Sequence, residues 1–229
     1  MGFKKWKLPQ TAPERVENLI SQTGMERIAA QILDGRGISD PQQAMQYIGC
    51  DSAARLHDPF LMKDMDKAVE RLSEAVEQGE QIAVYGDYDC DGITATAMLY
   101  SYLEDLGAQV IYYIPDRDVE GYGLNRAALD FLKEQQVELI VTVDNGISAL
   151  DEAVYAKELG IDLIITDHHQ PRPQLPQACA VIDPHRQDCE YPFKALCGAG
   201  VAFKLICAME GDLGGEEMIW HFGELAAIG

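Results

Sequence analysis

The chain has 229 residues, of which 47% are apolar and 24% are charged, and this excludes a repeat array, a disulfide-stapled miniprotein and a chain that is mainly disordered. With 18 Lys and Arg against 38 Asp and Glu, the net charge is −20, which argues against a protein that holds duplex DNA through a broad basic face. Binding of phosphates through divalent cations stays open, because clustered carboxylates attract such ions.

The cysteines and the N-terminus bear on the location of the protein. The 6 cysteines include no C-x-x-C pair, so neither a zinc knuckle nor a disulfide framework is indicated, and a reducing compartment fits best. The first residues, MGFKKWKLPQ, are basic but lack the apolar run of a signal peptide. No stretch of about 18 residues is free of charges and helix breakers. We expect a cytoplasmic protein that does not enter a membrane.

The first part of the chain predicts a small helical segment over residues 1–58. Polar and apolar residues follow a helical spacing over 14–31 and again over 40–48. Asp40 directly precedes Pro41, so an N-cap residue is followed by a proline suited to the first helical position.

After a helix expected over 63–78, apolar runs and helical patterns alternate along the chain. The expected strands cover 82–86, 110–114, 139–143, 162–166 and, as a shorter run, 179–182. The expected helices between and after them cover 94–106, 124–136, 148–159 and 200–209. Such alternation is typical of β-α-β units. The predicted fold class is therefore α/β, with a parallel sheet of about five strands and helices on both faces.

Carboxylates and histidines follow these strands at their carboxyl ends. The residues are Asp87, Asp144, Asp167 with His168 and His169, and Asp183. The carboxyl ends of parallel strands share one edge of a sheet, where open α/β folds bind their ligands. We therefore expect side chains about 100 positions apart in the chain to converge on one site.

Three carboxylates occupy alternate positions in the sequence DYDCDG: Asp87, Asp89 and Asp91. A calcium-binding EF-hand is excluded, because its ninth and twelfth positions fall on Ala95 and Met98 and because a helix would have to precede it. A phosphatase of the aspartyl-phosphate type, with Asp89 as nucleophile and Asp91 as acid, stays open. Capping of the following helix accounts for one carboxylate but not for three.

The sequence Asp167-His168-His169 is the most specific metal-binding pattern in the chain. Neutral imidazoles bind metals, and a neighbouring carboxylate can orient one of them. Because adjacent side chains diverge, we expect one histidine to be a ligand and the other to face the substrate. Carboxylates with imidazole and without thiolate favour Mn²⁺ or Mg²⁺ over a structural zinc. Asp144 begins a D-N-G sequence, which by itself indicates a turn and gains meaning from the other residues.

Two further segments are candidates for contact with a phosphate. Gly198 and Gly200 precede a helical run, so backbone amides there could approach an anion, although a tight turn explains the glycines equally well. Arg117 and Tyr122 follow the second expected strand, where they could hold a phosphate and stack on a base. An ordinary loop is the equal alternative for this second segment.

These motifs together resemble the DHH phosphoesterase superfamily and, within it, the RecJ-like 5′ to 3′ exonucleases specific for single-stranded DNA. The resemblance is carried by LHDPFLMKDMDKAVERL, VYGDYDCDG, YIPDRDVEGYGL, VTVDNGIS, ITDHHQP and CGAGVAFKL, in that order. The ordered set covers most of the chain and is specific, whereas D-N-G or H-H alone would not be.

The resemblance implies a site for two Mn²⁺ or Mg²⁺ ions that activate water against a phosphodiester. It implies that Asp89, Asp91 and His168 are ligands and that Asp144 is shared between the ions. His169 is implied to contact the scissile phosphate, so that His169 and Asp89 are the expected catalytic residues.

The sequence departs from the family pattern at three places. Wider relatives have a histidine ligand where this chain has Tyr85, so Asp87 is either a compensating ligand or a supporting residue. Asp183 stands where we expect asparagine, which leaves a metal role for it open. A further ligand aspartate, in a G-T-V/I-A-D stretch, is expected just beyond Gly229. We therefore expect residues 59–229 to be a catalytic domain truncated at its C-terminal end, in a fragment of a longer exonuclease.

The implied function is hydrolysis of single-stranded DNA from its 5′ end in repair or recombination, with single-stranded DNA as partner and a helicase or single-strand-binding protein as possible protein partners. A second interpretation keeps the two metals but acts on oligoribonucleotides or cyclic dinucleotides. A third is an inactive metal-binding scaffold. Clustered carboxylates argue against the scaffold, because they are costly to bring together without a function.

Overall fold

The computed structural model describes residues 10–48 and 56–229. The chain divides into two compact units, Met1–Arg55 and Leu56–Gly229. The first nine residues of the basic N-terminus lie outside the described part. Among the described residues, no helix combines the length and the apolar character that a membrane span requires. The expected division after residue 58 and the expected truncation stay predictions.

The smaller unit consists of helices α1 (Pro13–Thr23), α2 (Arg27–Gly35) and α3 (Pro41–Ile48) in its described part. The single helix expected over 14–31 is wrong, because two helices cover that range. Gly24 adopts a left-handed conformation with φ of 71°, and its amide donates to the Ile20 carbonyl at 2.9 Å. This closes α1 in the manner typical of a glycine C-cap.

The start of α3 agrees with the prediction from the sequence. Asp40 Oδ1 accepts a hydrogen bond from the amide of Gln43 at 2.8 Å, and Pro41 is the first helical residue. The core of the smaller unit is formed by the buried residues Val16, Leu19, Ala30, Leu33 and Ala44.

The larger unit contains a parallel five-stranded sheet in its described residues, as predicted. The strands are β1 (Ile82–Tyr85), β2 (Val110–Tyr113), β3 (Leu139–Val143), β4 (Asp162–Thr166) and β5 (Ala180–Ile182). Their spatial order is β2-β1-β3-β4-β5, and each neighbouring pair is parallel. The central strands are buried apolar runs, as expected for a sheet covered on both faces.

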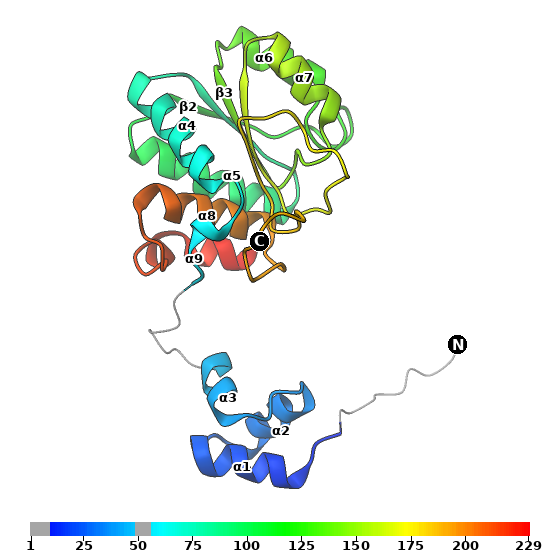
Figure 1. The fold of residues 1–229 in the computed structure, drawn as a ribbon, viewed down its shortest axis with the longest axis vertical. Coiled ribbons are helices and arrows are strands. Elements are labelled where there is room, and N and C mark those ends of the chain that lie inside the picture. The colour runs from blue at the N-terminus through cyan, green and yellow to red at the C-terminus, as the bar shows by residue number, and fades with distance from the viewer. Residues whose placement is uncertain (1–9, 49–55) are drawn as a thin grey trace, which may run out of the picture. The chain divides into compact units, whose positions relative to one another are not determined.

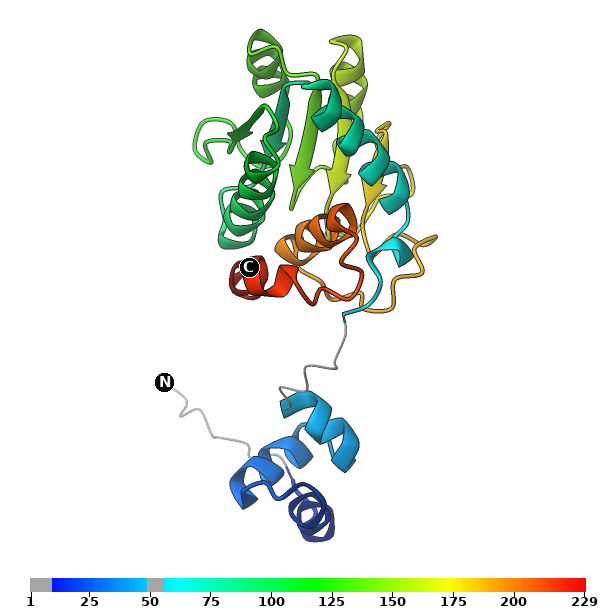
Figure 2. The same cartoon turned by 90° about the vertical axis from the view of Figure 1, so that its left-hand side faces the viewer.

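Helices cover both faces of this sheet (Figures 1 and 2). A short 3₁₀ helix (Pro59–Leu61) precedes the helices α4 (Met65–Gln78), α5 (Cys90–Asp105), α6 (Arg126–Glu134), α7 (Leu150–Glu158), α8 (Gly198–Glu210) and α9 (Met218–Ile228). Side chains alternate along β1: Val84 packs with α4, α5 and α8, whereas Ala83 and Tyr85 pack with α6 and α7. Helix α9 lies against α5 and α8 and was not expected from the sequence.

The strand order places a crevice between β1 and β3. From β1 the chain crosses to β2 on one side, and from β2 it returns to β3 on the other side of β1. Open α/β sheets bind ligands at such a reversal, outside the carboxyl ends of the strands. Asp87 follows β1 and Asp144 follows β3, so the two carboxylates flank this crevice.

Candidate metal centre

Asp144 occupies the centre of the site, directly after β3. Its backbone has a φ of 62°, a left-handed conformation that few residues other than glycine adopt. Gly198, the first residue of α8, packs directly on it: a Cβ at Gly198 would lie 2.4 Å from the Cβ of Asp144. Burial raises the pKa of Asp144 to about 6, against the lowering effect of the neighbouring His168. A neighbouring positive charge would lower this pKa and keep the carboxylate ionised at lower pH.

The DYDCDG segment folds tightly between β1 and α5 because two glycines permit close approach. A Cβ at Gly86 would lie 1.9 Å from Thr96 Oγ1, and a Cβ at Gly92 would lie 2.6 Å from the Cβ and carbonyl oxygen of Asp87. This packing brings the N-terminus of α5 against the end of β1. The loop between them thus presents its aspartates at the crevice.

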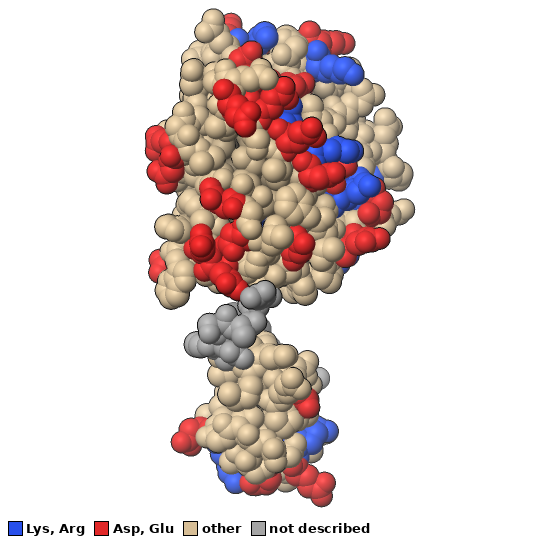
Figure 3. Space-filling view, turned by 60° about the vertical axis from the view of Figure 1, so that its left-hand side comes forward, with Lys and Arg blue, Asp and Glu red and all other residues tan. Residues whose placement is uncertain are grey.

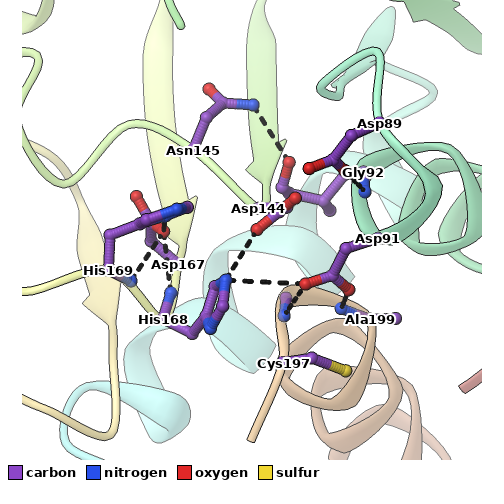
Figure 4. A network of polar contacts seen from close by, with 12 residues as sticks. Asp89, Asp91, Gly92, Asp144, Asn145, Asp167, His168, His169, Cys197 and Ala199 are labelled. Atoms are coloured by element: carbon purple, nitrogen blue, oxygen red, sulfur yellow. Dashed lines mark hydrogen bonds and ion pairs between the residues drawn. The ribbon is translucent and has the colours of Figure 1, made fainter. Parts of the chain in front are cut away.

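The three aspartates of this segment have different surroundings, and Figure 4 shows two of them, Asp89 and Asp91. Asp87 is buried, its Oδ1 has no hydrogen-bond partner, and burial raises its pKa. Asp89 is exposed and caps α5, since its Oδ1 accepts from the Gly92 amide at 2.9 Å. Asp91 accepts from the amides of Gly198 at 2.7 Å and Ala199 at 2.6 Å, so it binds the N-terminus of α8.

These contacts weigh against the phosphatase alternative. Both carboxylate oxygens of Asp91 accept hydrogen bonds from α8. Because both oxygens already accept from backbone amides, neither is placed to donate a proton to a leaving group. The capping explanation accounts for Asp89 and Asp91 in part, but it leaves the buried and unpartnered Asp87 oxygen unexplained.

Asp167 organises the segment that carries the two histidines. Its Oδ1 accepts from the amides of His168 at 2.7 Å and His169 at 3.1 Å, and its Oδ2 accepts from the amide of Ile147 at 2.9 Å. Burial alone would raise the pKa of Asp167, but hydrogen bonds from His169 and Ile147 bring it below its ordinary value. The carboxylate therefore stays ionised and joins the β3 and β4 loops.

The side chains of the two histidines point in different directions (Figure 4). His169 Nδ1 lies 2.7 Å from Asp167 Oδ1; because the carboxylate only accepts, Nδ1 carries the proton, and this contact raises the pKa of His169 to about 9. His168 turns toward the centre, with its Nε2 3.1 Å from Asp144 Oδ1 and 3.5 Å from Asp91 Oδ2. The contact with Asp144 raises the pKa of His168.

Two groups of side chains in the described part of the chain offer ligand atoms within 4.8 Å of one another. One group is Asp87, Asp89 and Asp144, and the other is Asp144, His168 and His169. Asp144 belongs to both, so the arrangement fits two neighbouring cations that share it. The unpartnered Oδ1 of Asp87 supports this fit, because a buried carboxylate oxygen without a donor requires a cation or a water. Oxygen and imidazole donors suit Mn²⁺ or Mg²⁺.

The structure places the other expected metal-site residues at the margin of these groups. Asp91 lies in neither group. Asp183 follows β5 and is fully buried, with Oδ1 accepting from the His185 amide at 2.6 Å and Oδ2 without a partner. Burial raises the pKa of Asp183 to about 7. Tyr85, at the position of the family histidine, donates its hydroxyl to the Gly123 carbonyl at 3.0 Å, away from the carboxylates.

The expected substrate-binding residues divide into two kinds. Tyr122 lies at the site: its hydroxyl is 3.2 Å from the Asp144 carbonyl and 3.3 Å from His169 Nδ1. Arg117 stacks over the ring of Tyr88, 5.2 Å from its centroid. The Gly198 amide already binds Asp91, and the Gly200 amide donates to Cys197 Sγ at 3.3 Å. The two glycine amides are therefore occupied by the protein, and their contact with a substrate phosphate stays a prediction.

A cavity of about 350 Å³ opens beside the histidines on the α6 and α7 side. Tyr122 and His169 line it together with Ser148 and Glu152. Ser148 and Glu152 were not singled out from the sequence, and no local pattern marks them, because both lie in the ordinary polar context of a helix start. Only the spatial approach of the β2 and β3 loops brings them to the site.

Comparison with known proteins supplies the family context. Residues 81–229 match the model of the DHH family, N-terminal domain. The chain is 44% identical over 225 residues to the "Single-stranded-DNA-specific exonuclease RecJ" of Bacillus subtilis, covering 98% of this chain and 28% of that protein. It is 46% identical over 149 residues to the Salmonella typhimurium protein of the same name, covering 65% of this chain and 26% of that protein.

Two solved structures share the fold. A RecJ from Thermus thermophilus in complex with Mn²⁺ has 30% identity and a TM-score of 0.72, covering 95% of this chain and 30% of that one. An exonuclease RecJ bound to manganese has 38% identity and a TM-score of 0.64, covering 72% of this chain and 42% of that one. The chain thus spans less than half the length of each of these relatives.

Proposed function

Because the chain belongs to the DHH family, we propose that it carries the metal-dependent phosphodiesterase centre of a 5′ to 3′ exonuclease acting on single-stranded DNA. The observation that carries the proposal is the pair of ligand groups that share Asp144 between β1 and β4. The similarity to RecJ proteins over 98% of the chain supports the exonuclease over the oligoribonucleotide and scaffold alternatives. We assign the catalytic centre to residues 59–229.

We assign the metal ligands from the geometry and the resemblance together. Asp144 is the shared ligand, Asp87 and Asp89 complete one position, and His168 belongs to the other. We assign His169, the third member of that second group, to the substrate instead, because its Nδ1 is bound by Asp167. Asp91 is a ligand by resemblance, and its contact with α8 leaves it 3.5 Å from His168 Nε2. When bound, two Mn²⁺ or Mg²⁺ ions provide positive charge for both the attacking and leaving oxygens and lower the pKa of water.

His169 and Tyr122 act on the substrate from the side of the cavity. Asp167 fixes the proton of His169 on Nδ1 and keeps the imidazole charged near neutral pH, since the pKa of His169 is raised to about 9. His169 therefore donates a charged hydrogen bond to the scissile phosphate from its other nitrogen. Tyr122 offers a ring face for a base, and Arg117 offers a guanidinium for a phosphate.

The charge of the protein supports a metal-centred mode of binding. Figure 3 shows a face of the larger unit on which Asp and Glu outnumber Lys and Arg. The net charge of −20 repels a phosphate backbone, which favours contact at the cations and at Arg117. Single-stranded DNA as the substrate supports a cytoplasmic location and a role in repair or recombination. A helicase or a single-strand-binding protein is the proposed partner that delivers the strand.

The test measures Mn²⁺-dependent release of mononucleotides from a 5′-phosphorylated single strand. It uses this chain and the longest natural polypeptide that contains its sequence. Asp144→Ala should reduce the rate at least about 100-fold, since even residues that only support a metal ligand contribute roughly 10- to 100-fold. Asp105→Asn, at the exposed end of α5, is the control and should change nothing. Unchanged activity of Asp144→Ala, or no cleavage by either wild-type protein, would refute the proposal.

A further inference from the structure

Tyr85 connects two of the loops that form the site. It is the last residue of β1 and is fully buried, with its ring stacked on Tyr113 at a centroid distance of 5.3 Å. Its hydroxyl donates to the Gly123 carbonyl at 3.0 Å, and its own carbonyl accepts from Asn145 Nδ2 at 3.2 Å. One residue thus holds the loop after β2 through its side chain and the loop after β3 through its backbone.

The connection closes into a ring through Tyr122. The Tyr122 hydroxyl donates to the Asp144 carbonyl at 3.2 Å, and Asp144 precedes Asn145 in the chain. The ring therefore runs from Tyr85 to Gly123, Tyr122, Asp144, Asn145 and back to Tyr85. It joins the carboxyl ends of β1 and β3 to the 121–123 turn on the side of the crevice where Tyr122 meets His169.

The 121–123 turn depends on this ring for its position. Gly121 and Gly123 have φ of 80° and 84°, so the turn is built from left-handed glycines on either side of Tyr122. Among the described residues, one hydrogen bond reaches the main chain of residues 121–123, and the Tyr85 hydroxyl donates it. Glycines add conformational freedom, and a turn that contains two of them needs an external contact to hold one conformation.

We propose that Tyr85 is a positioning residue, whose buried hydroxyl holds the 121–123 turn and thereby fixes the Tyr122 ring against the site where the substrate strand binds. The proposal rests on the proposed function, because Tyr122 is taken to contact the strand. Asn125 supports the same hydroxyl, since its Nδ2 lies 3.3 Å from it while its Oδ1 caps α6 through the Ala128 amide at 2.8 Å.

Tyr85→Phe separates this role from packing. The variant keeps the ring and its stacking on Tyr113 and removes only the hydroxyl, so β1 and the core beneath it stay filled. Tyr155→Phe is the matched control: the Tyr155 hydroxyl donates to Asp130 at 2.6 Å between α7 and α6, away from the site. Tyr85→Phe loses the hydrogen bonds to Gly123 and from Asn125, whereas Tyr155→Phe loses the one to Asp130. Only the first variant loses a contact to the 121–123 turn.

The first measurement needs no substrate. Backbone order parameters by NMR should fall at residues 121–123 in Tyr85→Phe, from the rigid range of about 0.85 toward about 0.6, and should not change in Tyr155→Phe. Mn²⁺ affinity should be equal in wild type and both variants, because no assigned ligand changes. Unaltered order parameters in Tyr85→Phe would overturn the proposal, whether or not the chain proves to be a nuclease.

The second measurement uses cleavage of a 5′-phosphorylated single strand by the polypeptide that is active in the preceding assay. Tyr85→Phe should raise KM about fivefold, the factor expected for loss of the hydrogen bond to Gly123, with a smaller effect on kcat. In a Tyr122→Ala background the same substitution should have no effect on KM, since Tyr85 acts through Tyr122. An equal rise of KM in both backgrounds would overturn the positioning role. Absence of cleavage by the wild type would instead count against the proposed function.

Discussion

Gly198 at the start of α8 and Asp144 at the end of β3 lie so close that a Cβ on the glycine would be 2.4 Å from the aspartate Cβ. The contact joins the helix whose N-terminus receives Asp91 to the carboxylate shared by both ligand groups. Backbone packing of α8 therefore determines where Asp144 lies.

Gly198→Ala should displace either α8 or Asp144, because no flexible side chain separates them. We expect a loss of about 1 to 3 kcal/mol in the free energy of unfolding and weaker Mn²⁺ binding, measured by urea denaturation and calorimetric titration. Gly223→Ala in α9 is the control: its Cβ would meet only Ile219, a movable side chain, and alanine favours a helix. Equal stability and metal affinity of the two variants would contradict the packing argument.

Asp87 and Asp91 should respond oppositely to neutralisation in the metal-free chain. Asp87→Asn removes a buried charge whose Oδ1 has no hydrogen-bond partner, so we expect stabilisation by about 1 kcal/mol. Asp91→Asn weakens the charged contact with the α8 amides and should cost about 1 to 2 kcal/mol. Urea denaturation in the presence of a chelator measures both values. Destabilisation by Asp87→Asn would contradict the absence of a partner at Oδ1 in the metal-free chain.

The metal-free chain should lose stability as pH rises from about 4 to 7. Burial raises the pKa of Asp144 to about 6 and of Asp183 to about 7, whereas an unfolded aspartate titrates near 4. Each carboxyl is easier to ionise in the unfolded chain, so unfolding releases protons across this range and becomes more favourable, by on the order of 2 kcal/mol per group.

His169 determines how the stability of the metal-free chain changes above neutral pH. Its folded pKa is raised to about 9, so the stability that it contributes is complete below about 6.5 and is lost as pH rises through 9. Thermal unfolding at several pH values with a chelator tests both limbs, and Mn²⁺ should reduce the slope between about pH 4 and 7. Asp183→Asn should flatten part of that slope. A profile that rises over this lower range would contradict the burial of these carboxyls.

The smaller unit should unfold in acid because of Asp34. This buried carboxylate accepts from Arg15, from Ser39 and from the Ala12 amide. The hydrogen bond with Arg15, followed by that with Ser39, holds the pKa of Asp34 well below its usual range. Its contribution is therefore present above about pH 4 and is lost as pH falls below that value.

Asp34→Asn should increase amide hydrogen exchange across α1 and α2 at neutral pH without affecting β1 to β5. Glu14→Gln, an exposed substitution in the first turn of α1, is the control and should leave exchange unchanged. Exchange in α1 and α2 that is equally slow in wild type and Asp34→Asn would show that the smaller unit does not depend on this carboxylate.

The strands and the convergence of the carboxylates could be predicted because both follow from local patterns. Apolar runs are followed by Asp87, Asp144 and Asp167. In a parallel sheet the carboxyl ends of these runs share one edge, so the three aspartates are predicted to lie there together. The break at Gly24 could not be separated from a tolerated helical glycine, since the apolar spacing continues on both sides of it. Helix α9 has no N-cap hydrogen bond and few polar residues, so it lacks the usual start pattern.

Contacts between distant residues account for the remaining differences. The Asp91 contact with the α8 amides spans 107 positions, and the Tyr85 contact with Gly123 spans 38. Neither has a local sequence pattern, because backbone groups are the partners and any residue supplies those. Contacts of the same kind bring the Gly198 amide to Asp91 and the Gly200 amide to Cys197. From the sequence alone, these amides were candidates for an anion site.

The reach of Asp91 across 107 positions has a consequence for synthesis of the chain. While the ribosome is still making residues beyond β4, the aspartates after β1 and β3 are already in the emerging polypeptide, but α8 does not yet exist to receive Asp91 or to pack on Asp144. Native pairing at this sequence separation forms late, after the loops between have been closed. The contacts of α8 with Asp91 and Asp144 can therefore form only after β1 to β4 have been made, and until then the nascent chain holds these strands without the support that α8 gives to the metal centre.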